Sequence, residues 1–157
     1  MPESIRYHFT QCFKFSAQKV FNWCTDYDPE DYELMGDKGV ERYISHITSS
    51  TILLRDVFQT STGQMEKQKL VELYPDTLSW TSTHLTGPNK YSQFLYKISL
   101  EGNEESILDF TGLHIEYGEK ELDKSEAKTL AYRLCKEDAQ AWKLLAKAME
   151  KELRTKT

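Results

Sequence analysis

The chain has 157 residues, a length at which one folded domain with its own core is expected over residues 1–157. Acidic residues outnumber basic ones, and a net charge of −5 argues against a nucleic-acid partner, because such binders gather Lys and Arg on one face. The three cysteines are an odd number and lie far apart with no CxxC pair, whereas a disulfide framework or a structural zinc site would need more cysteines or closer spacing.

No apolar run approaches the roughly 20 residues that a membrane-spanning helix needs, and the first residues show no signal-peptide pattern. We therefore expect a cytoplasmic protein with no integral membrane association. No motif indicates a metal, a cofactor or a catalytic residue, since nucleophile elbows, phosphate-binding glycine loops and zinc-protease helices are all missing from the sequence.

The chain begins with an alternating segment over residues 5–15, in which apolar and aromatic residues occupy one side. A period of two with aromatic residues predicts a half-buried strand. Ser16 then precedes apolar residues spaced by three and four, which predicts a short helix from Ala17 to Cys24 with Ser16 as its N-cap.

Residues 26–33 hold five carboxylates around Pro29, which raises the question of a metal or acid–base site. A calcium loop starting at Asp26 would need glycine at its sixth position, where Asp31 stands. A transition-metal site would need His or Cys among the acids, and an acid–base pair would need one acid in an apolar pocket that raises its pKa; the sequence indicates neither. We interpret the segment as a joint: Asp28 caps a second short helix, Pro29 occupies its first turn, and Gly36 ends it.

Six further strands are expected between Gly39 and Gly118, where β-branched and aromatic residues alternate between short turns. Their predicted ranges are 40–48, 51–60, 64–74, 77–86, 91–100 and 107–117. The remainder is one amphipathic helix from about Ser125, which we expect to be its N-cap. Seven antiparallel strands followed by a long helix predict an α+β fold in which the sheet curls around that helix.

The first short helix also resembles the opening of the START-related, birch-pollen-allergen-like (SRPBCC) superfamily, through Ala17, Val20, Phe21, Trp23, Asp26 and Tyr27. The order of predicted elements resembles that superfamily over nearly the whole chain. The resemblance implies a helix-grip fold, with two short helices after the first strand and a cavity between the sheet and the last helix. It carries over no catalytic residue, because members with this fold range from lipid-transfer and quinone-binding proteins to polyketide cyclase/dehydrase-like proteins and co-chaperones.

Alternation and helix periodicity direct a set of aromatic residues between sheet and helix, where they either pack or line a ligand cavity: Trp80, Phe94, Tyr96, Phe110 and Trp142. His84 and His114 share strand faces with members of this set and could orient a ligand or transfer a proton. Three charged residues within strands, Arg55, Asp56 and Asp109, are expected to point outward and form cross-strand ion pairs, because an unpaired buried charge is costly.

Three functions remain open. The first is binding of a small hydrophobic or amphipathic molecule, such as a lipid, quinone, isoprenoid or aromatic compound. The second is a cyclase, aromatase or dehydratase that uses cavity histidine or arginine, for example His84 with Arg55. The third is a protein-interaction module with a partner protein. A dry apolar cavity favours the first, converging polar groups favour the second, and a filled core with an exposed apolar patch favours the third.

Overall fold

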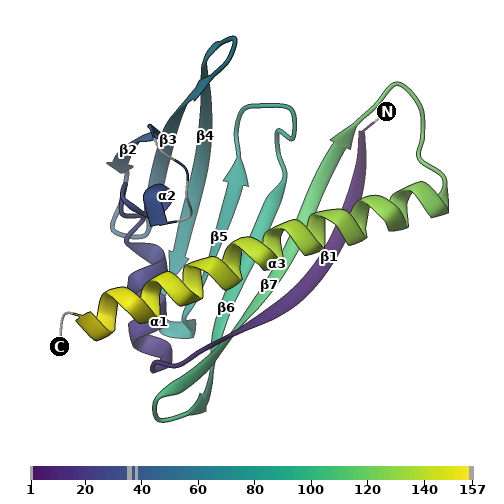
Figure 1. Cartoon of the computed structure of the whole chain (residues 1–157). Coiled ribbons are helices and arrows are strands. Elements are labelled where there is room, and N and C mark those ends of the chain that lie inside the picture. Colours follow the sequence, from purple (N-terminus) through teal and green to yellow (C-terminus); the bar gives the residue numbers. More distant parts are fainter. Residues whose placement is uncertain (1, 35–36, 38, 156–157) are drawn as a thin grey trace.

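The computed structural model describes residues 2–34, 37 and 39–155. Its helices and strands follow the order strand, two short helices, six strands and a long helix (Figure 1). Their bounds are β1 (Pro2–Phe13), α1 (Ala17–Thr25), α2 (Asp31–Leu34), β2 (Glu41–His46), β3 (Thr51–Thr60), β4 (Gly63–Tyr74), the 3-10 turn η1 (Pro75–Thr77), β5 (Ser79–His84), β6 (Gln93–Gly102), β7 (Glu105–Tyr117) and α3 (Lys124–Thr155).

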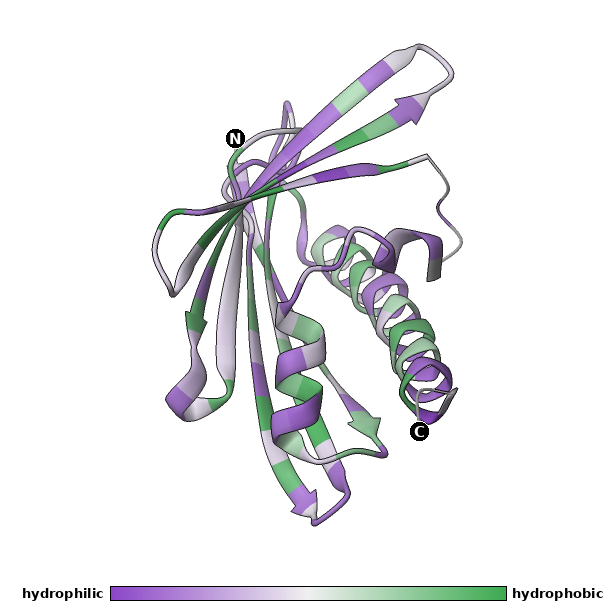
Figure 2. Ribbon diagram, turned by 90° about the vertical axis from the view of Figure 1, so that its left-hand side faces the viewer, coloured by the Kyte–Doolittle hydropathy of each residue, from purple (hydrophilic) through white to green (hydrophobic). Residues whose placement is uncertain are grey.

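The seven strands form one antiparallel sheet in the order β1-β7-β6-β5-β4-β3-β2. Strands β2 to β7 are a meander, and β1 is added at the free edge of β7, next to the point where the chain leaves the sheet for α3. The sheet is curved, and α3 crosses its concave face (Figures 1 and 2). The predicted helix-grip α+β fold is therefore confirmed.

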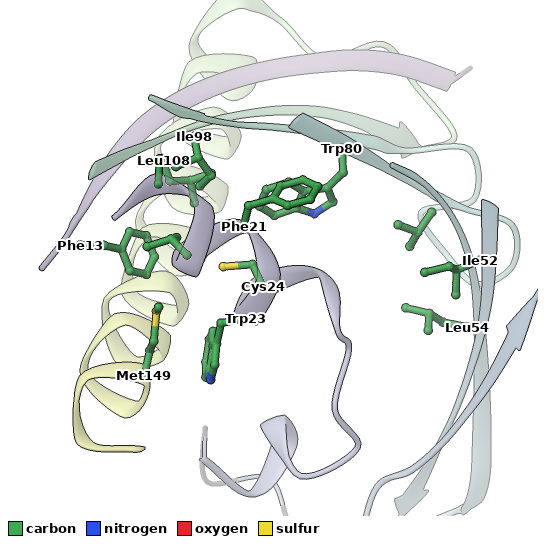
Figure 3. Packing of buried hydrophobic residues seen from close by; sticks show 13 residues of the cluster. Phe13, Phe21, Trp23, Cys24, Ile52, Leu54, Trp80, Ile98, Leu108 and Met149 are labelled. Atoms are coloured by element: carbon green, nitrogen blue, oxygen red, sulfur yellow. The ribbon is translucent and has the colours of Figure 1, made fainter. Parts of the chain in front are cut away.

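Helix α1 closes one end of the space between the sheet and α3 (Figure 3). As predicted, the Ser16 side chain accepts a hydrogen bond from the backbone N–H of Lys19, at 3.4 Å, and begins the helix. The buried face of α1 includes Val20 and Phe21, which belong to one hydrophobic cluster with Leu108 of β7 and Met149 of α3. Burial of this face ties the three layers together, because each large apolar side chain contributes roughly 1.5–3 kcal/mol.

Helix α3 begins one residue earlier than expected, and the prediction of Ser125 as its N-cap is wrong. The Asp123 carboxylate accepts from the backbone N–H of Glu126 at 2.8 Å, and the Glu126 carboxylate accepts from the N–H of Asp123 at 3.2 Å. This reciprocal pair is a capping box, and it satisfies two backbone donors where a lone serine would satisfy one.

The acidic segment before α2 forms two tight turns. The Asp26 carboxylate accepts from the N–H of Asp28 at 3.0 Å, and the Asp28 carboxylate accepts from the N–H of Glu30 at 2.9 Å. The segment does join the two short helices, but the predictions that Asp28 caps the second helix and that Pro29 occupies its first turn are wrong, because Pro29 and Glu30 lie in the turn and α2 begins only at Asp31. Gly36, expected to end the helix, lies outside the described residues.

No helix among the described residues is long and apolar enough to cross a membrane. Within the same residues, no group of three or more His, Cys, Asp or Glu side chains is arranged to hold a metal ion.

Candidate functional site

A row of aromatic rings crosses the concave face of the sheet. In the strand register Trp80 lies opposite Tyr96, Tyr96 opposite Phe110, and Phe110 opposite Phe9. Trp80 stacks on Tyr96 with ring centroids 4.7 Å apart, and Tyr96 meets Phe110 edge to face at 5.2 Å. Because side chains alternate along a strand, one aromatic at the same register position on four neighbouring strands produces a continuous wall.

Two cavities lie between this wall and α3, and together they form the candidate site. Lobe one, of about 180 Å³, is bounded by α1, the segment that follows it, and β2. Lobe two, of about 280 Å³, lies further along α3 toward its N-terminus. Lys69, Tyr96 and Trp142 line both lobes and therefore mark their boundary. The rings of Tyr96 and Trp142 lie 5.6 Å apart across it.

All seven residues expected at the cavity from the sequence lie on its walls. Trp80 lines lobe one, Tyr96 and Trp142 line both lobes, and the remaining four line lobe two: His84, Phe94, Phe110 and His114. Trp80 is 1% exposed and points from the sheet toward α1 (Figure 3), where it meets Phe21 edge to face. It therefore packs in the core as well as lining a lobe.

Lys69 supplies an amine at the boundary of the lobes. It lies on β4 at the same face as buried Val71, and in the register it sits opposite His84 of β5 and Leu54 of β3. Its Nζ atom is 3.9 Å from Oδ2 of Asp56. Burial lowers the pKa of Lys69 from 10.5 to about 8, and the Asp56 charge opposes the shift only in part.

A carboxyl group reaches lobe two from the helix. Asp138 lies on α3 one turn before Trp142, and its Oδ2 atom accepts a hydrogen bond from the Tyr7 hydroxyl of β1. Burial raises the pKa of Asp138 above its usual range, and it raises that of Tyr7 as well. Tyr7 can occupy this place because Gly112, opposite it on β7, has no side chain: a Cβ atom there would overlap the Tyr7 ring.

Two histidines add to the polar part of lobe two, which Ser82 and Asn89 also line. Burial lowers the pKa of His84 from 6.5 to about 4, and the nearby Lys69 charge adds to the effect, so that the ring is neutral at pH 7. The ring lies 5.0 Å from that of Phe94. His114 is held differently, because its Nε2 atom is 2.6 Å from a carboxylate oxygen of Glu116.

The expectation that Asp56 points outward is wrong. Asp56 is fully buried and lies opposite Arg42 in the register. Arg42 donates from Nε at 2.7 Å and from Nη2 at 2.9 Å to the two carboxylate oxygens, and the Tyr32 hydroxyl donates to the same group at 2.6 Å. Burial alone would raise the pKa of Asp56, but these donors and the Lys69 charge outweigh it and hold the pKa below its usual value. This pairing removes the cost on which the outward prediction depended.

The other two charged strand residues do point outward, as predicted. Arg55 is 44% exposed and contacts Glu66 of the neighbouring strand at 3.5 Å. Asp109 is 47% exposed and lies 3.2 Å from His8 of β1. The expected combination of His84 with Arg55 therefore does not form, since Arg55 lies on the opposite face of the sheet.

The acidic segment contributes to lobe one, which its interpretation as a joint did not include. Tyr27, Asp31 and Tyr32 line this lobe beside Arg42. Tyr27 has a left-handed backbone with φ of 51°, which turns the chain between α1 and α2. Burial, followed by the charges of Asp26 and Asp28, raises the pKa of Asp31 to about 7, so one acid of this segment does lie in a partly apolar pocket.

The polar cavity residues that the sequence analysis missed carry recognisable signals. Lys69 has the same strand parity as Val71 and Leu73, which places it on the inward face of β4. Asp138 is four residues from both Leu134 and Trp142, and so lies on the buried stripe of α3. In both cases the periodicity places the residue on the inward face, but its charge suggested exposure to solvent.

The sequence matches no protein-family model and no curated protein. Among solved structures, the chain is similar to the Zhui aromatase/cyclase from Streptomyces sp. R1128, with a TM-score of 0.73, 14% identity, and coverage of 98% of this chain and 96% of that one. It is similar to a START superfamily protein from Mycobacterium smegmatis, with a TM-score of 0.64, 16% identity, and coverage of 98% and 99%.

A third similar structure is norcoclaurine synthase from Thalictrum flavum in complex with dopamine and hydroxybenzaldehyde. Its TM-score is 0.70 at 12% identity, with coverage of 99% of this chain and 90% of that one. At such identities the likeness concerns the backbone, which agrees along almost the whole chain. The strand order, the position of α1 and α2, and these similarities lead to one conclusion: the chain has the helix-grip fold of START-related and birch-pollen-allergen-like proteins.

Proposed function

We propose that the protein binds a small aromatic or amphipathic molecule in the two-lobed cavity, with an oxygen-bearing group of the ligand next to Lys69. The observation that carries the proposal is the composition of the walls. Aromatic rings of Trp80, Tyr96, Phe110 and Trp142 surround a small number of convergent polar groups. Ligand sites of proteins have this composition, because apolar walls supply affinity while a few polar groups fix orientation.

The size of the lobes narrows the ligand class. Small-molecule pockets commonly measure roughly 300–1,000 Å³, and an apolar cavity of about 150 Å³ accommodates benzene. Lobes of about 180 and 280 Å³ therefore suit one or two rings each. Among the candidate ligands, this favours an aromatic or quinone-like molecule over a long-chain lipid.

A second function, catalysis of the cyclase, aromatase or dehydratase type, is favoured by the ionisable groups of lobe two. Lys69, His84 and Asp138 line one lobe together with the Tyr7 hydroxyl. A neutral imidazole can accept a proton and an ammonium group with a pKa of about 8 can donate one, which is the pair of roles that carbonyl chemistry requires. Lys69 would take the place expected for Arg55, next to the carbonyl oxygen.

The third function, docking of a partner protein, has no comparable support. The large apolar residues that are exposed are spread over several elements, for example Ile47 after β2, Leu100 on β6 and Tyr132 on α3. Single exposed apolar side chains are ordinary on protein surfaces.

Ligand binding is tested first by native mass spectrometry of the freshly purified protein, followed by solvent extraction of any bound molecule. A titration with naphthol and menadione, followed through tryptophan fluorescence, supplies an affinity because Trp80 and Trp142 line the lobes. Ala141→Phe fills lobe two and is expected to weaken binding at least tenfold, or ~1.4 kcal/mol. Gln140→Phe, at an exposed neighbouring position, is the matched control.

A bound aromatic compound, or saturable binding that Ala141→Phe weakens and Gln140→Phe does not, supports the proposal. A mass without ligand combined with unsaturable fluorescence changes contradicts it. If Ala141→Phe and Gln140→Phe have equal effects, the ligand binds outside lobe two.

A further inference from the structure

We propose that Lys69 captures small aromatic aldehydes or ketones covalently, by forming an imine between its ε-amino group and the carbonyl carbon of a ligand in the cavity. The inference rests on the proposed function, because the carbonyl compound must first bind between the sheet and α3. It goes further in assigning a reactive atom and a ligand class.

The position of the amine is the first argument. Lys69 lines both lobes beside Tyr96 and Trp142, so a ring held by either side chain places its substituent near the amine. About 23% of the Lys69 side-chain surface is accessible, although burial acts strongly on its charge. The side chain is therefore largely withdrawn from bulk water, while part of it is open to a molecule in the cavity.

The charges that face Lys69 leave it able to lose its proton. Asp56 of β3 and Asp138 of α3 favour the ammonium, while Arg42 of β2 and Lys67 of β4 oppose it, and burial is the largest influence. With a pKa of about 8, roughly half of the molecules carry the free amine at pH 8. An exposed lysine with pKa ≈ 10.4 is only about 0.4% free at that pH. Desolvation of this kind is the usual way in which proteins make a lysine nucleophilic.

The reaction balances with His84 and solvent water. The nitrogen lone pair of the neutral amine attacks the carbonyl carbon, and the C=O π electrons move to oxygen. The neutral ring of His84 takes one proton from the nitrogen and passes it to the oxygen, which gives a carbinolamine. A proton from solvent then joins the hydroxyl group, the nitrogen lone pair expels water, and the resulting iminium returns a proton to solvent, so the net products are the imine and one water molecule. No oxidant or reductant is required.

The walls select the carbonyl compound. A flat ring can stack against Tyr96 or Trp142, whereas the lobe of about 280 Å³ restricts its size to about that of one or two rings. The Tyr7–Asp138 pair places polar atoms on the side of the lobe formed by β1 and α3, where they can meet a polar substituent of the ring. Aromatic aldehydes and aryl ketones combine these properties.

The experiment traps the imine. The protein is incubated at pH 8 with benzaldehyde and sodium cyanoborohydride, which reduces an imine to a stable benzylamine, and modified peptides are identified by mass spectrometry. We expect Lys69 to be labelled at least tenfold faster than exposed lysines. Peptide mapping separates this label from that on the α-amino group, whose pKa is similarly low.

Two variants control for position and charge. Lys69→Arg retains the positive charge beside Asp56 but cannot form an imine, so position 69 must carry no label in this variant while its melting temperature stays near that of the wild type. Lys97→Met removes an exposed lysine from the outer face of β6 and is expected to leave labelling of Lys69 unchanged. Benzyl alcohol, which lacks a carbonyl group, is expected to slow labelling by competing for the cavity.

A parallel titration with benzaldehyde, without reductant, separates failure of this inference from failure of the proposed function. Saturable quenching of tryptophan fluorescence that Ala141→Phe weakens, together with Lys69 labelled no faster than Lys97, overturns the imine and leaves ligand binding intact. Absence of both saturable quenching and selective labelling contradicts both proposals. Selective labelling that benzyl alcohol slows supports both.

Discussion

The buried ion pair between Arg42 and Asp56 offers the sharpest test of the structure. The two side chains are 7% and 0% exposed, and they are joined by two short hydrogen bonds, with the Tyr32 hydroxyl donating to the same carboxylate. Asp56→Leu leaves the buried guanidinium without an anionic partner and also removes the carboxylate that lies 3.9 Å from the Lys69 amine. We expect it to lower the free energy of unfolding by ~3–5 kcal/mol, the cost of an uncompensated buried charge.

Arg42→Met is expected to cost about 3 kcal/mol, since the Asp56 carboxylate keeps only Tyr32 and the more distant Lys69. The double variant Arg42→Met/Asp56→Leu removes both charges and replaces them with apolar side chains of suitable size. It leaves the Tyr32 hydroxyl without its acceptor, which costs about 1–3 kcal/mol. We therefore expect the double variant to be more stable than the sum of the single effects predicts, by at least ~2 kcal/mol.

Urea unfolding followed by far-UV circular dichroism measures the free energy of unfolding of the wild type, the two single variants and the double variant. The comparison holds provided that the dependence of this free energy on urea concentration is equal in all four proteins. Arg55→Met, which removes an exposed arginine one position away, is the control and should change stability by less than ~0.5 kcal/mol. Additive single effects would refute the inference that the two charges compensate each other.

The pH dependence of stability gives a second check on Asp56. Because the pKa of Asp56 is lowered in the folded protein, the stabilisation by its carboxylate is complete above about pH 5 and declines as the pH falls below about 4.

Three further outcomes are expected. Asp31→Asn should stabilise the protein by about 1–2 kcal/mol at pH 8 and not at pH 4, while the control Glu33→Gln should leave stability unchanged at both pH values. The reason is that the Asp31 carboxyl keeps its proton up to about pH 7 in the folded protein and only up to about pH 4 in the unfolded chain. Equal shifts of the Asp31→Asn melting temperature at pH 8 and pH 4 would contradict this reasoning. The ring of His84 should titrate by NMR with a midpoint near pH 4, and a midpoint above 6 would place it in solvent. Gly112→Ala should lower the free energy of unfolding by ~1–3 kcal/mol, because the new methyl group overlaps with the Tyr7 ring, and should have little effect when Tyr7 is already replaced by Ala. Calorimetry of Gly112→Ala against the wild type, and of the double variant against Tyr7→Ala, measures both effects.

Much of the fold was predictable because local signals agreed with one another. The strand over residues 51–60 was predicted with its observed bounds, and Ser16 caps α1 as its hydroxyl and position suggested. Turn residues and alternating apolar side chains determine such features within a few positions of the chain. The errors occur where two local signals competed, as at the start of α3, where Asp123 and Glu126 form a more complete cap than Ser125.

The aromatic side of the cavity was also predictable, because alternation assigns Phe94 and Tyr96 to one face of their strand whatever the register. The polar side was not. Lys69 and Asp138 lie on inward faces by the same periodicity, but whether a charge can be buried depends on partners that come from other strands and from α3. Asp56 shows this most clearly, since its partners Arg42 and Tyr32 lie 14 and 24 residues away in sequence.

The sequence by itself determined the order and type of the elements, the curved antiparallel sheet and the aromatic character of its concave face. These follow from periodicity, turn chemistry and capping, all of which act over a few residues. Only the tertiary structure decided which charges enter the cavity, how Tyr96 and Trp142 divide it into two lobes, and which groups surround Lys69. The physical reason is that the pairing and desolvation of charges depend on strand register and on the approach of α3 to the sheet, which no short segment of the chain specifies.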